Sequence, residues 1–158
     1  MKKFLFAVVA LMSIVLSTSC GKRNENPLIK GMVGEWHLAQ SPVLTSNTKD
    51  NVDVYIEFKA DNTFELYQRD VNATSRYKKF SGTYLITDEI VTGKYSDGKS
   101  WGATEGYRTI LSAAGSLTMT NVLFPEDVSV YEPKAIPASV KEATRAEADE
   151  LTETPAYL

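Results

Sequence analysis

The alternation of apolar and polar side chains between Asn51 and Ile86 constrains the fold more than any other feature of the sequence. From residue 52 to residue 59, an apolar side chain at every second position alternates with a charged residue or a tyrosine, which is the period-two pattern of a strand with one buried face. A turn at Ala60-Asp61-Asn62 leads to a similar run at 64–67, and the chain returns again at 77–86. Three such runs in succession predict an antiparallel meander.

The same alternation, interrupted by turn residues, continues to residue 131. Ser96-Asp97-Gly98-Lys99 is a strong hairpin signal, because Asp-Gly supplies a residue that adopts positive φ. Gly102 and Gly106 indicate a bulge or bend within the run that follows Trp101. Pro137 is suited to the first position of a short C-terminal helix. The eight predicted strands begin near Gly34 and then cover 52–59, 64–67, 77–86, 90–95, 101–111, 117–122 and 128–131.

The first nineteen residues have the three parts of an export signal. Lys2-Lys3 precedes an apolar core from Phe4 to Leu16, and small polar residues then lead to Cys20. The core is shorter than the ~20 residues of a membrane-spanning helix, so we expect residues 1–19 to be removed. Cleavage directly before a cysteine resembles the bacterial lipoprotein signal, which implies that Cys20 carries lipid. The alternative is a simple secretory signal and an incidental free cysteine.

Charge and cysteine content exclude several classes of function. The 158 residues include 17 basic and 20 acidic ones, a net charge of −3, and loss of Lys2 and Lys3 with the leader makes it −5. A chain with this balance is not expected to bind nucleic acid. Cys20 is the single cysteine, which excludes an internal disulfide and a zinc site of several thiolates. The polar residues 20–30 predict a flexible tether that follows the lipidated cysteine.

Four short motifs carry a family resemblance. Gly34-Glu35-Trp36, Ile56-Glu57-Phe58, Asp61-Asn62-Thr63-Phe64 and Phe80-Ser81-Gly82-Thr83-Tyr84 resemble the lipocalin-like domain of small Bacteroides-type lipoproteins. The resemblance implies an all-β, eight-stranded antiparallel up-and-down barrel over residues 31–140, followed by a short helix. Residues 141–158 then form an acidic helix or tail. The resemblance also implies that Gly34 and Trp36 close the barrel floor, and that the protein lies in the cell envelope, at the outer membrane.

The sequence offers little for catalysis. His37 is the single histidine, and in a strand it points away from the face that carries Trp36, so we expect it in solvent rather than in a catalytic relay. Carboxylates occur mostly at turns, where they commonly accept backbone hydrogen bonds, and none has the spacing of a calcium-binding loop. We therefore predict no enzyme, no metal site and no cofactor.

Polar-tipped aromatic residues are the candidate ligand-binding residues. These side chains can line the barrel mouth or lie on an outer face as a contact for a glycan or a protein; alternatively, they belong to the strands for packing reasons alone. The candidates are Tyr55, Tyr67, Tyr95, Trp101 and Tyr107. A barrel of eight strands has room for its own side chains or for one small molecule. The residues expected to fill its interior are Val52, Val54, Ile56, Phe58, Phe64, Leu66, Phe80, Tyr84, Ile86, Leu111, Leu117 and Met119.

We therefore expect a membrane-anchored, non-catalytic binder of a small apolar or amphipathic molecule. The loop from Ser41 to Asp50 either crosses the mouth or is a disordered connection. The alternative function is an interaction module with a filled core that docks a glycan or an envelope protein through surface aromatic residues. An open apolar cavity favours the first function, and a packed interior with exposed Trp101 and tyrosines favours the second.

Overall fold

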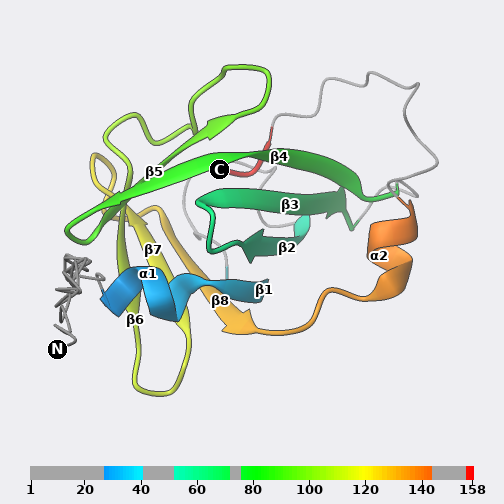
Figure 1. Ribbon diagram of the computed structural model, residues 1–158, viewed down its shortest axis with the longest axis horizontal. Coiled ribbons are helices and arrows are strands. Elements are labelled where there is room, and N and C mark those ends of the chain that lie inside the picture. The colour runs from blue at the N-terminus through cyan, green and yellow to red at the C-terminus, as the bar shows by residue number, and fades with distance from the viewer. Residues whose placement is uncertain (1–26, 41–51, 72–75, 144–155) are drawn as a thin grey trace, which may run out of the picture.

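The structure is a computed structural model that describes residues 27–40, 52–71, 76–143 and 156–158 (Figure 1). Its eight strands form one closed antiparallel barrel in which each strand pairs with the next and β1 pairs with β8. The strands are β1 (Gly34–Gln40), β2 (Val52–Phe58), β3 (Thr63–Asp70), β4 (Lys78–Thr87), β5 (Ile90–Tyr95), β6 (Tyr107–Leu111), β7 (Leu117–Asn121) and β8 (Val128–Pro133). The predicted all-β barrel of eight strands with a short C-terminal helix is confirmed.

The β2–β3 hairpin shows how the sequence pattern sets the register. Every residue from Val52 to Phe58 pairs with one from Asp70 back to Phe64, so apolar side chains of the two strands share the inner face. At the turn, Asn62 adopts φ of 64°, and the Asp61 carboxylate accepts hydrogen bonds from the backbone N–H and the hydroxyl of Thr63. The predicted turn therefore has the short polar residues that its backbone conformation requires.

The barrel has a floor and a mouth. The floor is the end that carries the β2–β3, β4–β5 and β6–β7 turns, and the mouth is the end that carries the 96–106 and 122–127 loops. Helix α1 (Pro27–Met32) precedes β1 at the floor and buries Met32 completely. The sequence predicted a flexible tether as far as residue 30, whereas the structure has this helix from residue 27 onward.

The interior is filled mainly by the predicted residues. Val54, Ile56, Phe58, Phe64, Leu66, Tyr84, Leu117 and Met119 are buried in one cluster, against which Val52, Phe80 and Ile86 pack while half-buried. The prediction for Leu111 was wrong, since its side chain is 37% exposed. Leu111 is the last residue of β6, and at this edge of the floor it packs against Gly31 of α1.

The predicted strand at 101–111 is shorter than expected. Strand β6 begins at Tyr107, because the preceding residue lies in a turn. Gly106 adopts φ of 84° there, and its N–H donates a hydrogen bond to the carbonyl of Ala103. The Trp101 N–H still donates to the Gly93 carbonyl of β5, residues 102–106 lie outside the strands, and the ring of Trp101 packs over Gly93. The bend that the two glycines indicated thus lies at the second of them, Gly106.

The described part of the C-terminal helix is α2 (Ala138–Ala143), and most of the predicted acidic helix or tail over residues 141–158 lies outside the described residues. Helix α2 follows Pro137 and packs Val140 on the outer face of β2 and β3. Among the described residues, no helix has the length and apolar character needed to cross a membrane. Cys20 and the Ser41–Asp50 loop lie outside the described residues.

Candidate functional site

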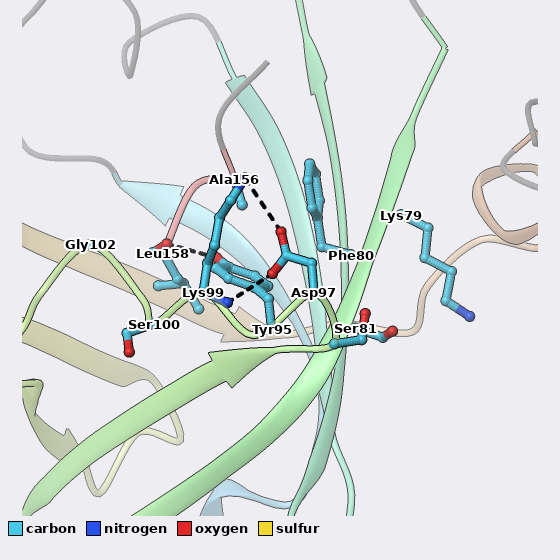
Figure 2. A pocket seen from close by; sticks show the side chains of 11 residues that line it. Lys79, Phe80, Ser81, Tyr95, Asp97, Lys99, Ser100, Gly102, Ala156 and Leu158 are labelled. Atoms are coloured by element: carbon cyan, nitrogen blue, oxygen red, sulfur yellow. Dashed lines mark hydrogen bonds and ion pairs between the residues drawn. The ribbon is translucent and has the colours of Figure 1, made fainter. Parts of the chain in front are cut away.

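A pocket of about 430 Å³ opens at the mouth of the barrel (Figure 2). Its walls come from β4, from the loop that follows β5 and from residues 156–158, a segment distant in sequence. The lining residues are Lys79, Phe80, Ser81, Tyr95, Ser96, Asp97, Lys99, Ser100, Gly102, Ala156 and Leu158. The volume lies within the range of small-molecule sites, and an apolar wall with a few polar groups is the usual lining of such a site.

Tyr95 connects this pocket to the barrel core. Its ring packs edge-on against Phe64 and Phe80, with centroid separations of 5.6 and 6.0 Å. Its hydroxyl donates a hydrogen bond of 2.7 Å to the carbonyl oxygen of Leu158 (Figure 2). Burial raises the pKa of Tyr95 above its ordinary value of 10.0, so near neutral pH the hydroxyl keeps its proton and is a hydrogen-bond donor.

Two further predicted residues, Trp101 and Tyr107, lie beside Tyr95 in the same core. Their rings are 6.1 Å apart, and Trp101 also packs edge-on against Phe64. Both side chains are almost completely buried. The structure thus brings Tyr95, Trp101 and Tyr107 together near the mouth, although Trp101 and Tyr107 do not line the pocket itself.

The inner wall beneath the pocket contains polar groups as well as rings. Gln68 on β3 and Ser129 on β8 are both buried, and each bonds to Tyr157. Among the described residues, the indole nitrogen of Trp101 is buried without a hydrogen-bond partner. A buried donor with no partner is uncommon and costs free energy of folding. This end of the barrel therefore has buried side-chain hydrogen-bonding groups that take no part in the pairing of the strands.

Residues 156–158 contribute to the site in a way that the sequence pattern did not predict. The sequence predicted an acidic helix or tail up to residue 158, yet Tyr157 and Leu158 are buried in the barrel core. The available signal was local: Tyr157-Leu158 ends a stretch that is otherwise acidic and poor in large apolar residues. Such a pair has apolar surface to bury, but the sequence does not say where.

The other two predicted residues, Tyr55 and Tyr67, are not among the residues that line the pocket and lie on the outer face of β2 and β3. They form a second apolar cluster with Tyr77, which Ile136 and Val140 cover. The five candidates therefore do not form one site. Four of them, all except Tyr95, are buried, so in this structure they do not form the exposed aromatic surface that the interaction-module alternative requires.

Two carboxylates organise the polar groups around this outer cluster. Asp53 accepts hydrogen bonds from His37, Arg69 and Tyr77. Burial raises the pKa of Asp53, but the hydrogen bonds, first that of Tyr77, outweigh burial and lower it. His37 was expected in solvent, yet it is half-buried, bonded to Asp53 and stacked on Tyr55 with ring centroids 4.4 Å apart. These contacts fix side chains on the barrel wall.

Glu65 is the centre of the second polar group. Its carboxylate accepts hydrogen bonds from Lys59 at 2.8 Å and from the Tyr67 hydroxyl at 2.6 Å, and Lys79 lies 2.9 Å away. Burial raises the pKa of Glu65, but the hydrogen bonds of these three residues outweigh it and lower the pKa from 4.5 to about 2. The carboxylate is therefore ionised throughout the physiological range.

Gly34 and Trp36, which the resemblance implied to close the barrel floor, lie at the floor end of β1. Gly34 has φ of 150° at the start of β1. Trp36 is buried, and its indole N–H donates a hydrogen bond of 2.8 Å to the carbonyl of Met32 in α1. This bond joins the floor helix to the first strand and satisfies a buried donor. Among the described residues, no group of three or more histidine, cysteine, aspartate or glutamate side chains is arranged to hold a metal ion.

Comparison with known proteins agrees with this architecture. A family model described as a lipocalin-like domain matches residues 32–113, just over half of the chain. Among solved structures, the NMR structure of a protein from Bacteroides uniformis is similar, at 21% identity and a TM-score of 0.49. That similarity covers 68% of this chain and 93% of the other. No protein of curated function matches the chain.

Proposed function

The chain belongs to the lipocalin-like domain family, and from this premise we propose that it is a non-catalytic binder of a small amphipathic molecule at the barrel mouth. A lipocalin-like barrel is a fold suited to binding small molecules. The observation that carries the proposal is the mouth pocket of about 430 Å³, whose lining includes the apolar side chain of Phe80 and the hydroxyl-bearing side chain of Tyr95. Apolar burial supplies the affinity, and the hydroxyl sets the orientation of the ligand.

An amphipathic ligand fits this lining better than a purely apolar one. The apolar wall is bordered by Asp97 and Lys99, an ion pair with the Lys99 nitrogen 3.4 Å from the carboxylate, and by Lys79. The deeper interior is filled by side chains of the chain itself. The ligand therefore lies at the mouth end of the barrel, with its apolar part on Phe80. Its polar end points toward the charged side chains of Asp97, Lys99 and Lys79.

The alternative, docking through surface aromatic residues, has less support. Trp101 is 1% exposed, and Tyr55, Tyr67 and Tyr107 are also buried. A glycan or protein partner would need these rings at the surface. The geometry favours the pocket.

We propose that the barrel is attached to the cell envelope, at the outer membrane, through lipid on Cys20. The support is the signal-like leader that ends at this cysteine. Two or more acyl chains give stable anchoring, since each buried methylene contributes about 0.8 kcal/mol. Metabolic labelling with a fatty acid in a bacterial host should label the protein and not its Cys20→Ser variant. An unlabelled mature protein recovered in the soluble fraction would exclude the anchor.

The binding proposal is tested with the substitution Phe80→Ala. We expect a panel of a fatty acid, a bile acid and haem to contain a compound that raises the melting temperature of the protein. Loss of the phenyl wall should weaken the binding of that compound about tenfold or more, since burial of such a side chain is worth roughly 1.5–3 kcal/mol. The matched control is Ile110→Ala, because Ile110 is an exposed apolar residue outside the pocket lining. Equal weakening by both substitutions would place the ligand elsewhere.

A further inference from the structure

Residues 156–158 are held inside the barrel mouth as a ligand would be. Tyr157 and Leu158 are 6% and 4% exposed, and both belong to the cluster formed by the inward-facing strand residues. The segment has no regular secondary structure, and it does not belong to any of the paired strands of the barrel. An extra strand would be held by a backbone ladder, and none of the described strands forms such a ladder with this segment.

Side chains from three different strands hold the segment. The backbone N–H of Tyr157 donates to the Gln68 side-chain oxygen of β3 at 2.7 Å. The Tyr157 hydroxyl and the Ser129 hydroxyl of β8 are 2.9 Å apart. The Tyr95 hydroxyl of β5 donates to the Leu158 carbonyl at 2.7 Å. Polar side chains that converge on one occupant from separate strands are the arrangement of a binding site.

The segment leaves part of this site unfilled. Ala156 and Leu158 form one wall of the mouth pocket, so the pocket and the space occupied by the segment are continuous (Figure 2). The Trp101 indole nitrogen lies buried in the same core without a hydrogen-bond partner among the described residues. Burial raises the pKa of Tyr131, and a hydrogen bond with Ser129 opposes this shift without cancelling it, so near neutral pH its hydroxyl keeps its proton.

We infer that residues 156–158 occupy the ligand site of the barrel from within the same molecule, and that a ligand binds by displacing them. This inference rests on the proposed function and specifies its ligand class. The ligand carries an acceptor oxygen for Tyr95 and an adjoining apolar group, and an aromatic hydroxyl on the ligand would add a hydrogen bond to Ser129. These are the groups that Leu158 and Tyr157 now supply. An occupant in the same molecule lowers the apparent affinity for a ligand by the fraction of time that the site is taken.

The test is to empty the site and to offer the segment as a separate molecule. The variant is Tyr157→Ala combined with Leu158→Ala, and the probe is the capped tripeptide acetyl-Ala-Tyr-Leu-amide, measured by titration calorimetry. We expect the variant to bind the tripeptide at least about tenfold more tightly than the unaltered chain does. Tyr77→Ala is the control, because it truncates a buried tyrosine of the outer cluster and should leave tripeptide binding at the level of the unaltered chain.

Two further measurements test the inference without depending on the folding of the double variant. Should the double variant not fold, Tyr157→Phe removes only the hydroxyl bonded to Ser129 and should strengthen tripeptide binding about threefold. In the unaltered chain, added tripeptide should speed hydrogen exchange at the Tyr157 N–H, which is otherwise protected by Gln68. A folded double variant that does not bind the tripeptide, or unchanged exchange at saturating tripeptide, would overturn the inference.

A second probe, the fatty acid laurate, separates this inference from the proposed function. Laurate binding with equal affinity to the unaltered chain and the double variant would reject displacement and leave the binding function in place. If the double variant binds the tripeptide but neither protein binds laurate, the proposed binding of an amphipathic molecule is rejected. The inference that residues 156–158 occupy a binding site would then still stand.

Discussion

Single residues explain how the barrel wall tolerates charge next to a core. Glu65 is the clearest case, because Lys59, Tyr67 and Lys79 all reach its carboxylate. The hydrogen bonds stabilise the ionised form, so the pKa falls from 4.5 to about 2 despite partial burial. A lowered pKa in the folded state means that the ionised carboxylate contributes to the free energy of unfolding.

Glu65→Gln should therefore destabilise the protein in a pH-dependent manner. The contribution of Glu65 is complete above pH 4.5, where the unfolded carboxylate is also ionised, and it is lost as the pH falls through about 2. We expect the substitution to lower the free energy of unfolding by roughly 2 kcal/mol at pH 7 and by little near pH 2. Urea denaturation at the two pH values measures this difference. Glu105→Gln, at an exposed residue, should have little effect at either pH, and a pH-independent loss for Glu65→Gln would contradict the account.

Gly93 is the residue on which the position of Trp101 depends. A Cβ atom at residue 93 would lie 1.9 Å from a carbon of the Trp101 ring, so Gly93→Ala requires the ring to move. We expect the substitution to lower the free energy of unfolding by about 1–3 kcal/mol and to shift tryptophan emission to longer wavelength as the ring meets water. Gly102→Ala is the control, because the nearest atom to its added Cβ is 4.0 Å away. Unchanged emission in Gly93→Ala would contradict the packing described for Trp101.

At the scale of elements, the strands follow the alternation of the sequence, and the differences occur where one residue overrides it. The register of β2 with β3 follows the predicted pattern from Val52 to Phe64. By contrast, Gly106 ends the predicted run at 101–111 through positive φ, and periodicity alone does not locate such a bend. Tyr55 and Tyr67 were predicted for the mouth or for an outer face, and the structure places them on the outer face. Their outward face is apolar because Ile136 and Val140 cover it, and strand pattern does not reveal an outer covering.

Helix α2 is the element that provides this covering. Val140 packs on the tyrosine cluster, and Lys141 donates a hydrogen bond of 2.6 Å to Glu35 of β1. Val140→Ala should lower the free energy of unfolding by roughly 1.5 kcal/mol, since the lost methyl groups and the cavity outweigh the better helix propensity of alanine. Ser139→Ala, at an exposed neighbouring residue, isolates the propensity effect and should be neutral or slightly stabilising in thermal denaturation. A neutral Val140→Ala would show that α2 does not stabilise the barrel.

At the scale of the whole molecule, the barrel is closed at the floor by α1 and occupied at the mouth by residues 156–158. The floor was predictable, because Gly34 and Trp36 carried the family resemblance and Trp36 now bonds to α1. Of the candidate site, Tyr95 was predicted and lines the pocket. Tyr157 and Leu158 were not predicted, because their contacts with Gln68 and Tyr95 span more than sixty residues of sequence. Local pattern carries no information about pairs so distant.

The central claim is that an amphipathic molecule binds at the mouth beside Tyr95, and NMR titration of the isotope-labelled chain with laurate tests it most directly. The account predicts shifts of backbone resonances at Phe80, at residues 95–102 and at residues 156–158, the segments that line the pocket. Resonances of the outer cluster at Tyr55, Ile136 and Val140 should stay in place, because these residues lie on the outer face and do not line the pocket. Shifts confined to the outer cluster, or no shifts at saturating laurate, would contradict the claim.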